Sequence, residues 1–116
     1  MRKTDKKIDN QLSAVLTDVC ETALKELAGF QWLTHLVQYP KIENTLKIIC
    51  VFDTKENLIL FNADSTNQKK LSSHIQSKLA KINIKLKNIN HHIFYDSEEA
   101  CACEHNGNWA SRLNNN

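Results

Sequence analysis

The most apolar run of the chain lies near its middle, at residues 46–53 of an otherwise polar sequence. One set of alternate positions in this run consists of Leu46, Ile48, Cys50 and Phe52. The other set holds Ile49 and Val51 between Lys47 and Asp53. A strand with apolar side chains on both faces is covered on both sides for most of its length. The run therefore predicts the central strand of a small sheet.

Two longer segments have apolar side chains at three- and four-residue spacings, which is typical of amphipathic helices. The first covers residues 5–28, with Thr4 or Asp5 as its N-cap and Gly29 as the residue that ends it. The second covers residues 65–83 and opens with a Ser-Thr-Asn-Gln sequence, which matches a capping box.

Three shorter runs predict further strands. Residues 30–39 fit a helix or a strand until Pro40 ends the element, and a strand is favoured because it pairs antiparallel with the central strand after a short connection. Residues 58–61 predict a short strand after a turn, and residues 91–95 predict the last strand.

The C-terminal part predicts a short acidic helix, because residues 96–99 combine capping side chains with carboxylates that the helix dipole favours. This helix is expected to end by Asn106-Gly107, before a turn that holds Trp109, and residues 114–116 are expected to be disordered. The chain thus predicts one α+β domain over residues 1–113. It combines a sheet of three or four strands with a long N-terminal helix, a second basic helix and the acidic C-terminal helix.

Composition narrows the class of protein. The chain of 116 residues fits one domain, and its net charge of +2 is too small to indicate a polyanion partner by itself. Arg2 and Arg112 are the only arginines, which disfavours bidentate phosphate recognition. The charged N-terminus lacks the apolar core of a signal peptide, and no run approaches a membrane span. A cytoplasmic protein with reduced cysteines and no membrane contact is therefore expected.

Charge is distributed unevenly along the chain. No acidic residue occurs between Asp64 and Asp96, whereas the same span holds six lysines and three histidines. Several of these lysines lie off the apolar stripe of the second helix, so they predict a solvent-facing basic ridge. The ridge consists of Lys69, Lys70, Lys78, Lys81 and Lys85. Lysines bind phosphates without sequence specificity, so RNA or a ribonucleoprotein is the first partner hypothesis. An ordinary solvated helix face is the alternative.

A second hypothesis is self-association or another protein contact. If residues 30–39 form an edge strand, Trp32 and Leu36 share one face of it, and Phe30 adds to the patch. The alternative is that Trp32 fills the core.

The third and least favoured hypothesis is a thiol or metal site at Cys101, Cys103 and His105. Residues two apart on a helix point to nearly opposite sides, so the spacing is poor and no metal or cofactor is predicted. The position of Cys101 near a helix start favours a lowered pKa, which the neighbouring glutamates oppose. Because the chain also lacks a glycine-rich phosphate loop and a nucleophile elbow, we expect neither an enzyme nor a small-molecule substrate.

Five segments of the chain, at residues 1–10, 29–37, 49–54, 95–99 and 104–109, carry a resemblance to known sequences. On these segments the sequence resembles a family of short, uncharacterised proteobacterial proteins over nearly its full length. Members of that family are sometimes described as regulators of the Fis type, which bind DNA through a C-terminal helix-turn-helix. In this chain the C-terminal part instead predicts a strand followed by an acidic helix.

The predicted order of elements is also similar to that of ribosome-binding factor A, a KH-like RNA-binding protein. The resemblance implies RNA binding and concerns architecture. The run at residues 58–61 has no counterpart, and the chain lacks the Gly-x-x-Gly backbone clamp of KH domains. The matching parts are the helix at 5–28, the strands at 30–39 and 45–53, the helix at 65–83 and the strand at 90–96.

Overall fold

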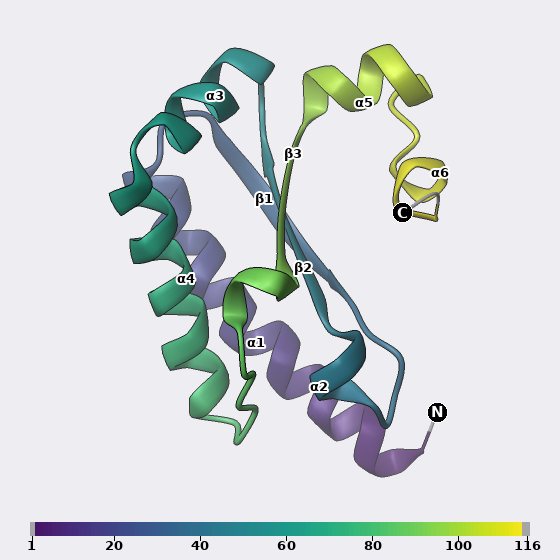
Figure 1. The fold of residues 1–116 in the computed structure, drawn as a ribbon. Coiled ribbons are helices and arrows are strands. Elements are labelled where there is room, and N and C mark those ends of the chain that lie inside the picture. The colour runs from purple at the N-terminus through teal and green to yellow at the C-terminus, as the bar shows by residue number, and fades with distance from the viewer. Residues whose placement is uncertain (1, 115–116) are drawn as a thin grey trace.

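The computed structural model describes residues 2–114, over which the chain forms six α-helices, one short 3-10 helix and a three-stranded sheet. The helices are α1 (Lys3–Glu26), α2 (Ile42–Thr45), α3 (Lys55–Ala63), α4 (Ser65–Ala80), η1 (Ile89–His92), α5 (Glu98–His105) and α6 (Trp109–Asn114). The strands are β1 (Phe30–Leu36), β2 (Lys47–Phe52) and β3 (Ile93–Ser97). This is the α+β arrangement that the sequence predicts (Figure 1).

The sheet has β2 at its centre, antiparallel to β1 and parallel to β3. Because parallel neighbours need a crossover, α3 and α4 connect the end of β2 to the start of β3. The register places Thr34, Ile49 and Phe94 side by side across the three strands, and it places Leu36 beside Lys47. The predicted central strand and its antiparallel pairing with β1 are therefore confirmed.

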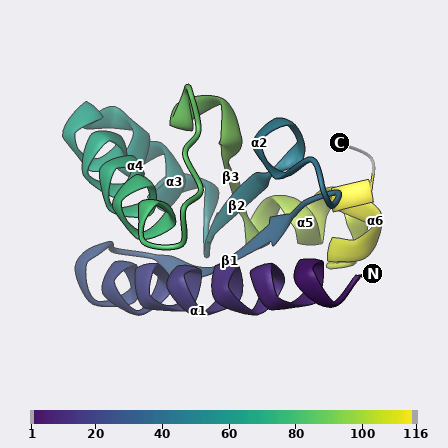
Figure 2. The ribbon, with the colours of Figure 1, turned by 90° about the horizontal axis from the view of Figure 1, so that it is seen from below.

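One face of the sheet, which we call the inner face, packs against α1 and α4 (Figure 2). Phe52 is central to this packing, since its ring lies 5.6 Å from that of Phe30 and 4.9 Å from that of Phe61, measured between centroids. Full burial of such a side chain stabilises the fold by about 1.5–3 kcal/mol. The main inner-face and helix contributors are Leu12, Leu16 and Val19 of α1, Ile48 and Cys50 of β2, and Leu71, Ile75 and Leu79 of α4.

The apolar run at residues 58–61 is helical, so the prediction of a strand there is wrong. Thr54 caps α3 by accepting a hydrogen bond from the backbone N–H of Asn57, at 3.1 Å. On this helix Phe61 is buried and Leu58 is half-buried, whereas Ile59 and Leu60 remain exposed. A four-residue apolar run fits either element, and here the cap decides between them.

The ends of the two long helices differ from prediction by small amounts. Helix α1 begins at Lys3 after Arg2, and Asp5 is buried rather than serving as the N-cap. Helix α4 is capped by Asp64, whose carboxylate accepts from the Thr66 N–H and hydroxyl at 3.0 and 2.6 Å. The predicted capping box does not form. Instead the Gln68 amide donates to Asn62.

At the C-terminal side, α5 begins and ends where the sequence predicts. The Ser97 hydroxyl accepts from the Ala100 N–H at 3.1 Å, and the chain leaves the helix at Asn106 and Gly107, both with positive φ. Asn114 belongs to α6, so its predicted disorder is wrong, and the rest of the predicted tail, residues 115–116, lies outside the described residues.

Gly29 holds the junction between α1 and β1. Its φ is +81°, and a Cβ at this position would lie 2.6 Å from both Asn57 Nδ2 and Asp53 Oδ1. The Gly29 carbonyl also accepts from the Asp53 N–H at 2.8 Å. Only glycine fits here without strain, because both the backbone conformation and the close approach of the next turn exclude a side chain.

Candidate nucleic-acid interface

The opposite side of the sheet, which we call the outer face, is divided into two halves. Its residues are Trp32, Thr34 and Leu36 of β1, Lys47, Ile49 and Val51 of β2, and Phe94 and Asp96 of β3. The C-terminal helix pair, α5 and α6, lies against one half, beside Trp32 and Asp96 (Figures 1 and 2). The other half, around Leu36, Lys47 and Phe94, borders a groove.

Two tryptophans hold the covered half together. The indole N–H groups of Trp32 and Trp109 both donate to the carboxylate of Glu98, at 2.5 and 3.1 Å. The two rings meet edge to face with centroids 4.9 Å apart, a geometry that aromatic pairs prefer. A strand, the start of α5 and the start of α6 are thereby joined at one carboxylate.

Arg112 is the second anchor of the C-terminal helix pair. Its Nε and Nη2 donate to the two carboxylate oxygens of Asp96 at 2.6 and 2.9 Å, and its Nη1 donates to Glu104 at 2.7 Å. The hydrogen bonds to Asp96 raise the pKa of Arg112, and the bond from Arg112 lowers the pKa of Glu104. A two-pronged guanidinium contact of this kind fixes orientation as well as charge.

The uncovered half carries a groove of about 750 Å³. Leu36 and Phe94 are 39% and 45% exposed, and Lys47 Nζ lies 5.9 Å from the centroid of the Phe94 ring. His92 is fixed beside them, with its Nδ1 2.7 Å from the Leu46 carbonyl oxygen. A second hollow of about 430 Å³ continues the groove toward α6. The polar lining of the groove includes Gln38, Asn44, Thr45 and His91.

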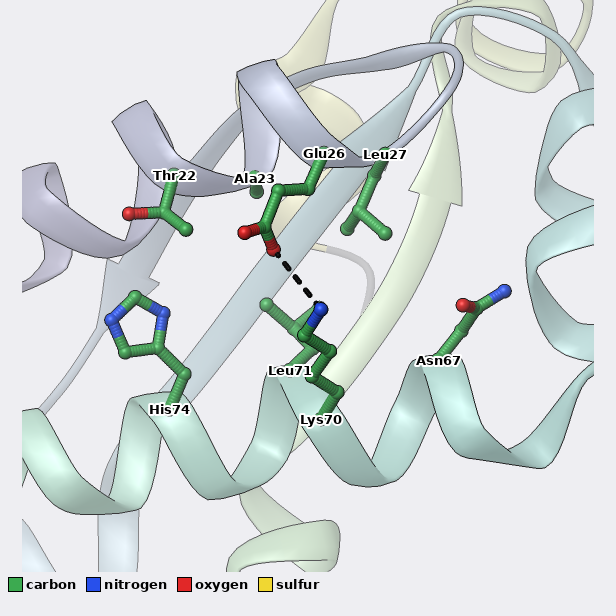
Figure 3. Close-up of a pocket in the computed structure, with 8 residues that line it drawn as sticks. All are labelled: Thr22, Ala23, Glu26, Leu27, Asn67, Lys70, Leu71 and His74. Atoms are coloured by element: carbon green, nitrogen blue, oxygen red, sulfur yellow. Dashed lines mark ion pairs between the residues drawn. The ribbon is translucent and has the colours of Figure 1, made fainter.

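The lysines of the predicted ridge lie in different environments in the structure. Lys70 and Lys78 lie eight residues apart on α4 and turn toward α1, where they meet Glu26 at 3.7 Å and Asp18 at 3.6 Å. Figure 3 shows the Glu26–Lys70 pair across a pocket of about 230 Å³ between the two helices. These lysines are partly neutralised, while Lys69 is exposed on a different side of α4.

The basic character is strongest beyond the end of α4. Lys81, Lys85 and Lys87 are all exposed, and none of them takes part in an ion pair within residues 2–114. The apolar residues that alternate with the last two, Ile84 and Leu86, are buried, so the segment presents its lysines outward. The chain then continues into η1, whose last two residues, His91 and His92, line the open groove, and from there into β3.

The predicted contact patch of Phe30, Trp32 and Leu36 does not form. Phe30 is buried in the core against Phe52, because a bulge at the start of β1 shifts its register relative to Trp32. Trp32 is on the outer face but packs on Trp109. Leu36 is the member of the set that stays exposed, and it lines the groove.

The predicted thiol or metal residues also separate. Cys101 is fully buried, Cys103 is exposed and His105 lies near Arg112, with 3.1 Å between His105 Nδ1 and Arg112 Nη1. Burial raises the pKa of Cys101, opposite to the lowering that its position in the helix favours. Within residues 2–114 no three metal-ligating side chains gather in a metal-sized group.

A hydrogen-bonded polar cluster links α1 to β1. Asp9 Oδ1 accepts from the Tyr39 hydroxyl at 2.8 Å and lies 3.1 Å from His35 Nε2. The contacts from His35 and then Tyr39 lower the pKa of Asp9, while burial and the Asp9 carboxylate raise that of Tyr39. Both partners therefore converge on one oxygen of the carboxylate, which joins the N-terminal helix to the end of the first strand.

Comparison with known proteins adds no relative: no family model, no curated protein and no solved structure matches this chain. None of the helices in the described part of the chain combines the length and apolarity needed to cross a bilayer. The resemblances to the proteobacterial family and to ribosome-binding factor A therefore remain predictions.

Phe94, Lys47 and His92 were not singled out as site residues by sequence reasoning. The signal for them is the alternation on β2 and β3, which puts Lys47 and Phe94 on the face opposite Ile48 and Ile93. What the sequence does not contain is the position of the C-terminal helix pair, which contacts Trp32 and Asp96 and leaves Phe94 exposed.

Proposed function

We propose that this protein is a non-enzymatic binding module that contacts RNA or a ribonucleoprotein through its basic surface. The observation that carries the proposal is the exposure of Lys81, Lys85 and Lys87 without ion-pair partners in residues 2–114, inside a span that has no acidic residue from 65 to 95. Unpaired surface lysines release counterions from a phosphate backbone and bind it with a strong salt dependence.

The lysines of the predicted ridge contribute unequally to the proposed RNA-binding surface. Lys81 and Lys85 belong to the exposed segment, and Lys87 extends it. Lys70 and Lys78 contribute less because Glu26 and Asp18 lie beside them, and the side chain of Lys78 is only 22% exposed. The exposed Lys70–Glu26 pair is weak enough for a phosphate to compete. Lys69 lies on another side of α4 and would contact a longer strand only.

The order of elements supports the same function by analogy. The chain has a helix, two strands, a helical connection and a further strand in the order on which the resemblance to ribosome-binding factor A rests. The run at residues 58–61, which had no counterpart when taken as a strand, belongs to the crossover as α3. A similar order of elements supports RNA binding as a hypothesis, but it does not identify the RNA that is bound.

The test is salt-dependent binding of a fluorescent single-stranded RNA by two matched triple variants. Lys81→Gln/Lys85→Gln/Lys87→Gln removes the exposed segment, and Lys3→Gln/Lys6→Gln/Lys7→Gln removes three exposed lysines from the start of α1. Since each phosphate contact on a single strand adds about 0.7 to the slope of log K against log salt, the first triple should lower that slope by about 2.

The control triple should leave the slope nearly unchanged. Absence of binding by the unmodified protein at about 50 mM salt, where lysine contacts are strongest, would contradict the proposal. Equal losses in both triples would contradict it as well, because they would show a response to net charge without a defined surface.

A further inference from the structure

The open half of the outer sheet face combines three properties that seldom occur together on a surface. It is hollowed by the groove of about 750 Å³, the lining of the groove includes the exposed ring of Phe94, and Lys47, His91 and His92 line the same groove. Phe94 projects from β3 into this groove and is among the most exposed large apolar residues of the described chain.

The surroundings of the ring favour an anionic and planar ligand. Lys47 lies with its Nζ 5.9 Å from the ring centroid, and His91 and His92 line the same groove. Of the nearby carboxylates, Asp96 is held by both prongs of Arg112, which leaves Glu43 as the acidic residue in the lining of the groove. The amides of Gln38 and Asn44 add donors and acceptors of the kind that base edges require.

We infer that this groove binds an unstacked base of single-stranded RNA against the ring of Phe94, with the adjoining phosphates on the side of Lys47, His91 and His92. An aromatic side chain on an open sheet beside cations is a stacking platform, because every base offers a π-face and each phosphate a negative charge. Leu36 provides a second apolar contact, since it lies beside Lys47 in the sheet register.

This inference rests on the proposed function, and it adds the site that selects single strands. The basic segment of Lys81, Lys85 and Lys87 is continuous in the chain with η1, whose last residues border the groove. One strand of RNA would thus contact phosphate-binding lysines first and the stacking ring next. The bases of a duplex stay stacked and paired, so a duplex engages the lysines alone.

The experiment compares two probes of equal length and charge, an eight-nucleotide oligouridine and an abasic oligoribonucleotide. Both are titrated into the full chain, into Phe94→Leu, which keeps the apolar character and removes the ring, and into the Lys81/Lys85/Lys87 triple glutamine variant. Ile59→Ala serves as the matched control, because Ile59 is an exposed apolar residue on α3. Circular dichroism and urea unfolding verify that each variant is folded.

The unmodified protein should bind oligouridine more tightly than the abasic probe by about 5- to 150-fold, the range of one stacked base. Phe94→Leu should abolish that preference without changing binding of the abasic probe, and Ile59→Ala should preserve it. The triple glutamine variant should bind both probes more weakly than the unmodified protein, by similar factors.

Equal binding of the two probes by the unmodified protein, or an unchanged preference in Phe94→Leu, would overturn the groove assignment and leave the proposed function standing. If neither probe binds at about 50 mM salt, both proposals are overturned. A groove that serves a protein partner instead would give the first of these outcomes, with equal affinity for the two probes.

Discussion

The two faces of the sheet are covered by different chemistry. The inner face is closed by apolar packing against α1 and α4, with Ile48, Cys50 and Phe52 fully buried. The outer face is closed over one half only, where the hydrogen-bonding anchors Glu98 and Arg112 supplement the contact of two tryptophans. The inner face therefore carries most of the stability, and the open part of the outer face is available for binding.

This difference explains why β2 is apolar on both sides without being symmetrical. Phe52 belongs to the main core under the helices, whereas Val51 is buried outside that cluster, between Trp32 of β1 and Asp96 of β3 in the sheet register. Further along the outer face of β2, the apolar residue Ile49 is followed by Lys47, and Lys47 lines the groove. The residue pattern of one strand thus changes from core to surface along a single face.

The largest expected contrast comes from the same substitution on opposite faces. Phe52→Ala should lower the free energy of unfolding by about 3–5 kcal/mol, because it leaves a cavity among packed rings. Phe94→Ala should change it by less than about 1 kcal/mol, because Phe94 is 45% exposed and no cavity forms. Urea unfolding followed by tryptophan fluorescence measures both, and similar losses in the two variants would contradict the asymmetry.

A smaller effect is expected from loosening the covered half. Arg112→Met should lower the free energy of unfolding by about 2–3 kcal/mol, because it leaves the half-buried Asp96 carboxylate without its charged donors. Lys70→Met is the control, since the exposed Lys70–Glu26 pair is worth about 0–1 kcal/mol.

Thiol reactivity tells whether the C-terminal helix pair loosens by itself. In Arg112→Met, the buried Cys101 should react faster with a thiol reagent, while Cys50 in the main core should remain protected. Exposed Cys103 reacts quickly in either protein and serves as the internal reference. Equal acceleration at Cys50 and Cys101 would show that the two faces open together.

An effect confined to alkaline pH concerns the inner face. Burial raises the pKa of Cys50 and of Tyr95 to about 12 each, above the values of about 8.5 and 10 in an unfolded chain. The folded state therefore retains protons that the unfolded state loses, so stability is complete below about pH 8.5 and decreases as pH rises toward 12. The pKa of Tyr39 is raised as well, so its ionisation adds to the loss of stability at high pH.

Urea midpoints measured in reductant between pH 8 and about 11.5 test this dependence. The double variant Cys50→Ala/Tyr95→Phe should have a shallower decrease than the unmodified protein. Cys103→Ala, which changes an exposed thiol, should reproduce the unmodified curve. A double variant with an undiminished slope would show that the two buried groups are not responsible.

Long periodic segments were predictable because their pattern is local. The apolar stripe of α1, that of α4 and the two-sided apolarity of β2 each state which face is buried, and the structure confirms the type of all three elements. The start of α5 was predictable for the same reason, since Ser97 satisfies a backbone donor three residues away. Such signals need no knowledge of distant parts of the chain.

Short runs and side-chain partners were not predictable, because contacts far apart in sequence decide them. The run at residues 58–61 suits a strand or a helix, and on the helix its Phe61 is buried against the rings of Phe52 and Tyr95 in the sheet. Lys70 belongs to a basic stripe in the sequence, yet antiparallel packing brings Glu26 beside it. Likewise the ring of Trp32 packs against that of Trp109, which lies 77 positions later in the sequence, and not against a partner molecule.

The sequence alone therefore determined the class of fold, the central strand and the span without acidic residues. Only the tertiary structure decided which apolar and basic side chains stay at the surface. The physical reason is that exposure depends on what another segment covers. Here α5 and α6 follow β3 and are held at Trp32 and Asp96, while Phe94 stays 45% exposed and shares one groove with Lys47.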